Sequence, residues 1–213
     1  MENREIQIKT GDDYINGNLN VPDNARGIII FAHGSGSSRF SPRNNFVAQE
    51  LQNARFATLL IDLLTVDEEA KDMVTAEYRF DIELLSQRLL DATNYVDLNS
   101  ATSSLPVGYF GSSTGAAAAL EAAATLNNIR AIVSRGGRPD MAENLTRLTA
   151  PTLLIVGEYD EEVLKLNYQA LQKMKNALQK NIQIVPRANH LFEEPGALEK
   201  VLRLSRDWFI KYL

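Results

Sequence analysis

The sequence offers few side chains that could carry out catalysis. Cysteine is absent, and only two histidines, His33 and His190, occur among 213 residues. This composition excludes thiolate nucleophiles, disulfides, iron–sulfur clusters and zinc sites with cysteine ligands, and it leaves little for a metal site built on histidine. Chemistry would therefore come from oxygen nucleophiles, carboxylates and one or two imidazoles, with no cofactor and no metal.

A Gly-x-Ser-x-Gly motif centred on Ser113 stands directly after the apolar run VGYF and directly before a stretch of small residues. A nucleophile on a sharp strand-to-helix turn has strained backbone angles, and its neighbours two residues away must lack side chains so that strand and helix can approach. Ser113 is the predicted nucleophile, and the Thr114 backbone N–H is a predicted oxyanion donor at the positive end of the helix. We expect Ser112 to pack or hydrogen-bond beneath the turn. The alternative is that the motif is only a serine-rich helix cap.

A serine nucleophile needs an imidazole base and a carboxylate that orients it. Where the nucleophile lies on such a turn, the chain order is nucleophile, acid, histidine. Only His190 follows Ser113, and it lies in the loop between the apolar run 182–185 and the last helical pattern. Asp160, in the acidic loop after the run 152–156, is the predicted acid, and Glu158 is the alternative.

A second glycine-containing loop, HGSGS at 33–37, follows the apolar run 27–32. Such a loop can turn a backbone N–H toward the scissile carbonyl. The Ser35 N–H is the predicted second oxyanion donor, with Gly34 or Gly36 as alternatives. We expect His33 to hold this loop by hydrogen bonds.

Four arginines are predicted to lie in loops near the carboxyl ends of the strands, where open α/β sheets bind ligands: Arg39, Arg43, Arg135 and Arg138. Guanidinium groups suit carboxylate or phosphate recognition, so these loops, together with Gly34, are candidate contacts for an anionic substrate. The alternative is that the arginines form ion pairs that fix the loops, with Asp62, Asp81, Asp140 or Glu193 as partners.

The elements that must position these residues alternate along the chain. Short apolar runs rich in β-branched residues, apolar on both faces, predict strands at 27–32, 57–63, 107–110, 129–133, 152–156 and 182–185. Helical periodicity predicts helices at 44–54, 79–98, 115–126, 161–178 and 196–213. This alternation predicts an α/β sheet, and the polar–apolar alternation at 5–9 and 14–20 predicts an antiparallel hairpin at its edge. Residues 65–78 form either a lid or a solvated extension of the following helix.

Composition excludes several classes of protein. The net charge of −5 offers no basic surface for nucleic acid, and no apolar run reaches the roughly 18 residues of a membrane span. The first residues resemble no targeting segment, which predicts a cytoplasmic location. We expect a single domain over 1–213, as a monomer or homodimer.

Together these segments resemble the α/β-hydrolase superfamily and, within it, the dienelactone hydrolase-like proteins. The resemblance rests on residues 33–44, 108–120, 134–140, 151–163 and 189–198. It implies a Ser/Asp/His triad, helices on both faces of an eight-stranded, mostly parallel sheet whose second strand is antiparallel, and no metal or organic cofactor. Dienelactone hydrolases proper use a cysteine nucleophile, whereas this chain has serine, which puts a dienelactone substrate in doubt. Serine before the nucleophile, where alanine is common, is a smaller departure.

The sequence thus predicts a serine hydrolase that cleaves a small ester or lactone through Ser113, His190 and Asp160. The alternative is a non-catalytic protein of the same fold that binds a ligand or partner, because function resides in the site rather than in the fold.

Overall fold

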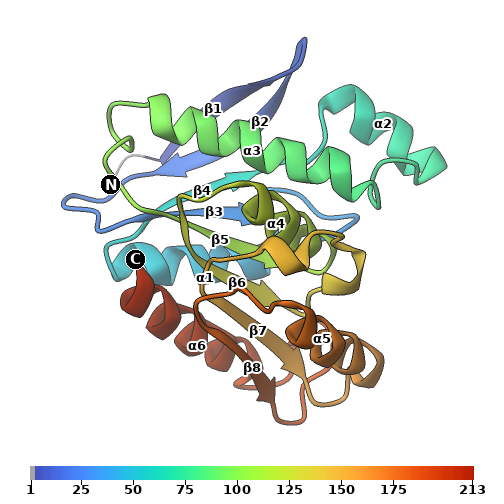
Figure 1. The fold of residues 1–213 in the computed structure, drawn as a ribbon. Helices are drawn as coiled ribbons and strands as arrows, with labels where there is room; N and C mark the ends of the chain where they lie inside the picture. The colour runs from blue at the N-terminus through green and yellow to red at the C-terminus, as the bar shows by residue number, and fades with distance from the viewer. Residues whose placement is uncertain (1–2) are drawn as a thin grey trace.

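The computed structural model describes residues 3–213 and contains one eight-stranded sheet with helices on both sides (Figure 1). The strands are β1 (Asn3–Thr10), β2 (Asp13–Asn20), β3 (Ile28–Ala32), β4 (Ala57–Ile61), β5 (Val107–Ser112), β6 (Ile129–Arg135), β7 (Thr152–Gly157) and β8 (Lys180–Val185). The α-helices are α1 (Pro42–Asn53), α2 (Val66–Thr75), α3 (Ile82–Leu98), α4 (Thr114–Thr125), α5 (Glu161–Lys173) and α6 (Ala197–Tyr212). Two short 3₁₀ turns, η1 (Pro139–Met141) and η2 (Leu145–Arg147), follow β6.

The strand order is β1-β2-β4-β3-β5-β6-β7-β8. The strand β2 pairs antiparallel with both β1 and β4, and all other neighbours are parallel. The expected sheet, including its antiparallel second strand, is confirmed. Because β3 and β5 to β8 run parallel, the loops that follow them meet at one edge of the sheet, and every predicted catalytic residue lies in or beside one of those loops.

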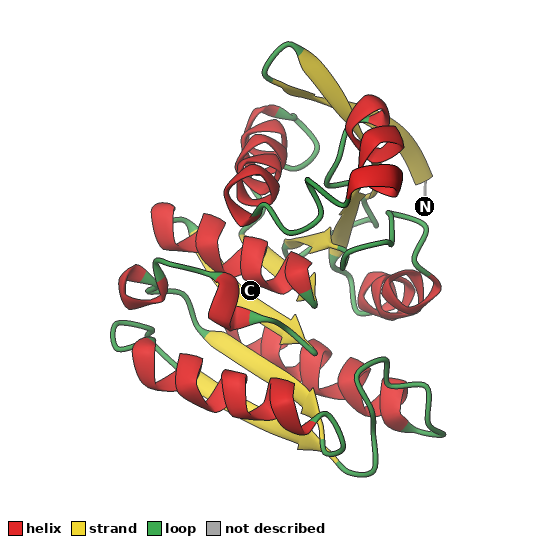
Figure 2. Cartoon of the chain, turned by 90° about the vertical axis from the view of Figure 1, so that its right-hand side faces the viewer, coloured by secondary structure: helices red, strands yellow, loops and turns green. Residues whose placement is uncertain are grey.

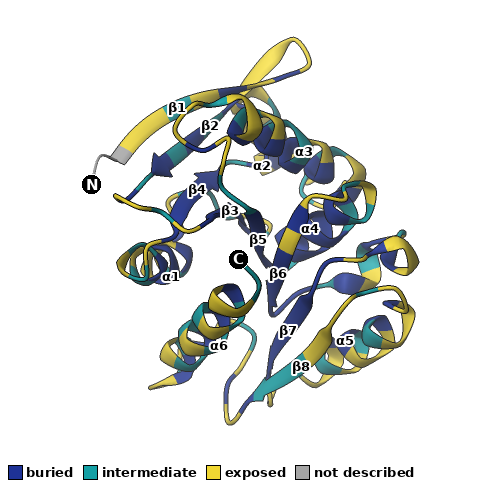
Figure 3. Ribbon diagram, turned by 60° about the vertical axis from the view of Figure 1, so that its left-hand side comes forward, coloured by how far each residue is buried: buried dark blue, intermediate teal, exposed yellow. Residues whose placement is uncertain are grey.

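The central strands are buried on both faces, as the apolar runs predict (Figure 3). In β3 the side chains of Ile28 and Ile30 enter one core, and those of Ile29 and Phe31 enter the other. The first core lies under α3, α4 and α5, and the second lies under α1 and α6. Figure 2 shows helices on both sides of the sheet. Each large apolar side chain buried in this way contributes about 1.5–3 kcal/mol relative to exposure, so the two cores hold the sheet rigid beneath the loops.

The segment 65–78 contains a separate helix, α2, which contradicts the expectation of an extension of the following helix. Thr65 caps α2 with a capping box formed with Glu68. The helix ends at Ala76, whose φ is 54°. The buried Asp72 then accepts hydrogen bonds from the backbone N–H groups of Tyr78 and Arg79. The segment is therefore not an extension of the next helix.

Two predicted helix boundaries are wrong by a few residues. The helix expected from residue 79 begins at Ile82, because the Arg79 N–H is bonded to Asp72 and Asp81 caps the new helix. The helix expected to continue to residue 178 ends at Lys173. The chain then turns, and the Leu178 N–H donates to the Thr149 carbonyl just before β8 begins.

Candidate active site

Ser113 forms a strained turn between β5 and α4. Its backbone angles are φ 51° and ψ −120°, and its side chain makes no capping hydrogen bond to the helix. The two glycines of the motif permit this turn: a Cβ on Gly111 would lie 2.4 Å from Ala116 Cα, and one on Gly115 would lie 2.2 Å from the His33 carbonyl oxygen. The motif is therefore a tight strand-to-helix turn and not a serine cap.

The backbone around Ser113 is fixed from the next strand, whereas its hydroxyl is free. The Ser113 N–H donates to the Arg135 carbonyl at 3.2 Å, and its carbonyl accepts the Arg138 N–H at 3.1 Å. Within residues 3–213 the Ser113 Oγ has no hydrogen-bond partner. By contrast, Ser112 is buried and donates to Asn44 Oδ1 at 3.1 Å, which confirms its expected place beneath the turn.

The structure brings Asp160 and His190 together. His190 Nδ1 lies 2.6 Å from Asp160 Oδ2, and the carboxylate is mostly buried while the imidazole is 38% exposed. With Nδ1 directed at the carboxylate, Nε2 is the free ring nitrogen. The alternative acid, Glu158, accepts the Arg187 backbone N–H instead.

The imidazole also lies close to the strand that fixes Ser113. A Cβ on Gly136, the residue after Arg135, would be 3.5 Å from His190 Cε1. Ser113 and His190 therefore both lie beside the segment 135–136. In this conformation, no hydrogen bond joins Ser113 to His190 among the described residues. Active-site contacts of this kind often tighten only when substrate binds.

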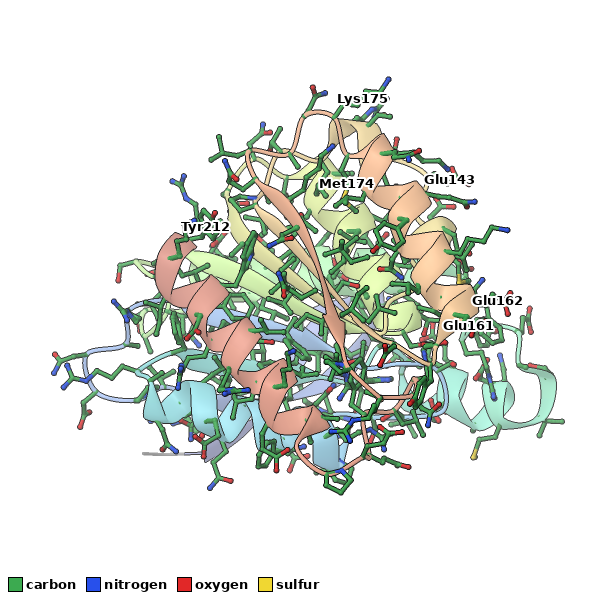
Figure 4. The ribbon with its side chains drawn as sticks, turned by 90° about the horizontal axis from the view of Figure 1, so that it is seen from below. Glu143, Glu161, Glu162, Met174, Lys175 and Tyr212 are labelled. Carbon is green, nitrogen blue, oxygen red and sulfur yellow. The ribbon has the colours of Figure 1, made fainter. Side chains whose placement is uncertain are left out.

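The other acids of the Asp160 loop serve the following helix. Glu161 and Glu162 occupy the first turn of α5, where Figure 4 labels both. Negative charge at this position favours the partial positive end of a helix. Asp160 is thus the one acid of the loop that contacts His190.

His33 holds the loop at 33–37 by hydrogen bonds, as expected. Its Nδ1 lies 2.8 Å from the Gly34 carbonyl oxygen, and its Nε2 accepts the Leu63 N–H at 3.1 Å. A ring nitrogen that accepts a hydrogen bond carries no proton, so this imidazole is neutral. Burial lowers the pKa of His33 below its usual value, in agreement with that pattern.

Ser35 has a different partner from the one the sequence suggests. Its N–H donates to Thr114 Oγ1 at 2.9 Å, so this predicted oxyanion donor is occupied. The physical reason is that Thr114 is buried, and its hydroxyl would otherwise have no hydrogen-bond partner among the described residues. Gly34 lies close to Ser113, because a Cβ on Gly34 would be 3.1 Å from Ser113 Cβ.

The arginines divide into two groups. Arg39 pairs with Asp62 and Glu5, Arg43 pairs with Glu193 at 2.8 Å, and Arg138 pairs with Asp140 at 2.8 Å. Ion pairs that fix loops therefore explain Arg39, Arg43 and Arg138. Arg135 is different, because this residue is only 8% exposed and has no ion-pair partner among residues 3–213.

Two kinds of feature are absent from the described part of the chain. Between residues 3 and 213, no three histidine, aspartate or glutamate side chains gather in a way that could hold a metal ion. Over the same residues, no helix combines the length and apolar character that a membrane span needs.

The strain at Ser113 can be measured through stability. We expect Ser113→Gly to have a free energy of unfolding about 1 kcal/mol higher than Ser113→Ala, because only glycine adopts φ 51° and ψ −120° without strain. Urea denaturation of both variants measures this difference. Equal stability of the two would contradict a strained turn.

The neutral state of His33 predicts a loss of stability in acid. Its folded-state pKa is lowered, so its contribution is fully present above the unfolded value of about 6.5 and is lost as the pH falls. We expect the free energy of unfolding to fall less between pH 7 and pH 5 in His33→Asn than in the wild type. His190→Asn, which keeps His33, is the control and should retain the full decrease. If the free energy of unfolding of His33→Asn fell with pH as steeply as that of the wild type, the neutral state of His33 would be refuted.

Comparisons with known proteins place these observations in a family. The model of the dienelactone hydrolase family matches residues 15–207. A dienelactone hydrolase from Anabaena variabilis has 51% identity and a TM-score of 0.96, with 100% of this chain and 98% of that chain covered. An esterase from Pyrococcus furiosus, Pf2001, has only 16% identity, with a TM-score of 0.82 over 99% of this chain and 93% of its own. That last likeness concerns the fold alone.

Two Mycobacterium tuberculosis proteins named as phosphoribosyl transferases are 53% identical over 215 residues. The match covers 100% of this chain but 47% of each relative, so the chain spans about half the length of these proteins. The family match over residues 15–207 and the structural likeness at 51% identity lead to one conclusion: this chain has an α/β-hydrolase fold and belongs to the dienelactone hydrolase family.

Proposed function

We propose that this protein is a serine hydrolase that cleaves a small ester or lactone through a covalent acyl-enzyme. Ser113 is the nucleophile, His190 the general base and acid, and Asp160 the residue that orients the imidazole. The observation that carries the proposal is the 2.6 Å contact between His190 Nδ1 and Asp160 Oδ2, at the sheet edge where Ser113 adopts its strained turn.

The first half of the reaction forms the acyl-enzyme. His190 Nε2 takes the proton of Ser113 as Oγ bonds to the carbonyl carbon, and the π electrons of the carbonyl move to its oxygen. When the tetrahedral intermediate collapses, the bond to the alcohol oxygen breaks and that oxygen takes the proton from His190. Water then repeats the sequence: it gives a proton to His190 as its oxygen bonds to the acyl carbon. The bond from that carbon to Ser113 Oγ then breaks, Oγ takes the proton back from His190, and the acid product leaves.

The oxyanion needs two donors beside Ser113. The Thr114 N–H, at the start of α4, is the first donor, and the partial positive charge of the helix end adds to it. The Ser35 N–H is the proposed second donor. It is held next to the turn by Thr114 Oγ1, so the developing oxyanion would replace that hydroxyl as its acceptor. An N–H that exchanges one acceptor for another is not left unsatisfied at either stage.

The names of the relatives bear on the substrate in different ways. The Anabaena relative is named as a dienelactone hydrolase, which favours ester or lactone hydrolysis for this chain. We do not carry the transferase name over, because this chain covers only 47% of each of those relatives and itself matches the dienelactone hydrolase family over residues 15–207.

The competing proposal is a binding protein without catalysis. Such a protein has no need of a strained serine, a buried carboxylate and an imidazole directed at that carboxylate. Strain of this kind costs about 1–3 kcal/mol, and it persists where it forms part of a mechanism. The combination favours the enzyme.

Covalent labelling tests the nucleophile. We expect a fluorophosphonate to add one adduct to the wild type and to Ser112→Ala, and none to Ser113→Ala, because only Ser113 has a free, activated hydroxyl. Intact-mass spectrometry measures the adduct, and turnover of 4-nitrophenyl acetate by the same samples should follow it. A folded wild type that forms no adduct would favour the binding protein.

Two neighbouring acids test the assignment of Asp160. We expect Asp160→Asn to lower kcat about 10³–10⁴-fold, because the amide no longer orients His190 or stabilises its charged form. Glu158→Gln is the matched control on the same loop, and it should change kcat by no more than a few-fold because Glu158 contacts only the Arg187 backbone. If Glu158→Gln lowered kcat more than Asp160→Asn does, Glu158 would be the residue that orients His190.

A further inference from the structure

The segment at the end of β6 contacts both Ser113 and His190. Segment 135–138 accepts the Ser113 N–H at its first carbonyl, and its Arg138 N–H donates to the Ser113 carbonyl at 3.1 Å. Between these two bonds the chain approaches the imidazole: a Cβ on Gly136 would lie 3.5 Å from His190 Cε1 and 3.2 Å from the His190 carbonyl oxygen. The position of segment 135–138 therefore sets the spacing between the proposed nucleophile and the proposed base.

Asn167 holds this segment from α5. Its Nδ2 donates to the Gly137 carbonyl at 2.9 Å and to the Val163 carbonyl at 2.7 Å, so both hydrogens of the amide are used. The residue is completely buried. Val163 is the third residue of α5, and Asp160 is the N-cap of that helix. One side chain thus joins segment 135–138 to the first turn of the helix that begins at the proposed acid.

The backbone at Gly137 has no space for a side chain of its own. A Cβ there would lie 2.0 Å from Ser134 Oγ and 2.8 Å from Ala116 Cβ. This part of the chain can therefore be fixed only through its backbone groups. The Gly136 N–H donates to the Ile155 carbonyl in β7 at 2.8 Å, and the buried Gly137 carbonyl accepts the amide from α5. Without that amide, a buried carbonyl would lose a hydrogen bond, which is costly.

Asparagine is an unfavourable choice at this position if stability alone matters. It is a poor residue for a helix interior, because its side chain competes for backbone hydrogen bonds. The buried Asn167 Oδ1 also has no hydrogen-bond partner among the described residues. A leucine would fill a similar volume with better helix propensity and no unsatisfied acceptor. What asparagine adds is the donor to Gly137, and local rules are commonly broken in this way at functional sites.

We propose that Asn167 is a positioning residue, which holds segment 135–138 against α5 and so fixes the spacing between Ser113 and His190. It acts through the Gly137 carbonyl. Its effect on catalysis rests on the proposed hydrolase function, whereas its hold on the segment does not. The effect is large because a displacement of about 1 Å between reacting groups can lower a rate about 100-fold.

Kinetics test the effect on catalysis. Asn167→Leu and Asn167→Ala both remove the donor, the first at similar volume and the second without a larger side chain. We expect kcat and kcat/KM for 4-nitrophenyl acetate to fall together by about 10–100-fold in both variants, because misplaced groups weaken the transition state and not substrate binding. The rate of fluorophosphonate labelling should fall as well, since it needs the same serine and imidazole.

Ala170→Gly is the matched control on the same helix. Ala170 is buried on α5, and glycine there weakens the helix without removing the Asn167 amide. We expect this variant to lose stability in urea and to keep the kcat, KM and labelling rate of the wild type.

Hydrogen exchange measures the hold on the segment without catalysis. The Gly136 and Arg138 N–H groups donate to backbone carbonyls of Ile155 and Ser113. Relative to the amides of β3, we expect both to exchange about tenfold or more faster in the two Asn167 variants than in the wild type, because the segment opens locally. In Ala170→Gly the same ratio should stay at its wild-type value.

The outcomes separate the two claims. If the Asn167 variants keep wild-type exchange at Gly136 and Arg138, or exchange faster but keep kcat, the proposal is overturned. It is also overturned if Ala170→Gly loses as much kcat as the Asn167 variants do, because the cause is then the weakened helix. If the wild type neither turns over the ester nor forms an adduct, while exchange still rises in the Asn167 variants, the hydrolase proposal fails and the anchoring of segment 135–138 stands.

Discussion

The site depends on the close approach of β5 and α4 at Ser113. The chain can turn this sharply only because Gly111 and Gly115 leave no side chain between the strand, the helix and the carbonyl oxygen of His33. The strain is held in place by backbone hydrogen bonds from Ser113 to Arg135 and from Arg138 to Ser113, so the neighbouring strand fixes the geometry. A relaxed turn at this position would move the serine away from both the helix end and the imidazole.

The rest of the fold keeps that turn rigid and gathers the other groups around it. The central strands are buried on both faces by two separate cores, and their parallel direction brings the loops after β3, β5, β6, β7 and β8 to one edge. The two histidines of the chain have opposite roles at this edge. His33 is buried, neutral and bonded on both ring nitrogens, whereas His190 keeps one nitrogen free and directs the other at Asp160. Burial and hydrogen bonding, rather than residue type, separate these roles.

Much of this arrangement could be predicted from the sequence. Strand runs and the order of Ser113, Asp160 and His190 suffice to bring the last two into contact, because parallel strands end at the same edge. The partner of the Ser35 N–H could not be predicted, since it depends on which hydroxyl lies within 3 Å after folding. Asp72, which separates α2 from α3, could not be predicted for the same reason: the N–H groups that donate to its carboxylate come from a turn that only the folded chain creates. The buried Nη1 of Arg135, which has no hydrogen-bond partner among the described residues, likewise appears only in the folded chain.

The most direct test of the account is a crystal structure of the wild type after reaction with a fluorophosphonate. The account predicts phosphorus bonded to Ser113 Oγ, the phosphoryl oxygen within about 3 Å of the Thr114 N–H, and His190 Nε2 facing the adduct while Nδ1 keeps its contact with Asp160. Phosphorus on another residue, or an adduct on Ser113 with its phosphoryl oxygen directed into solvent and His190 turned away, would contradict it.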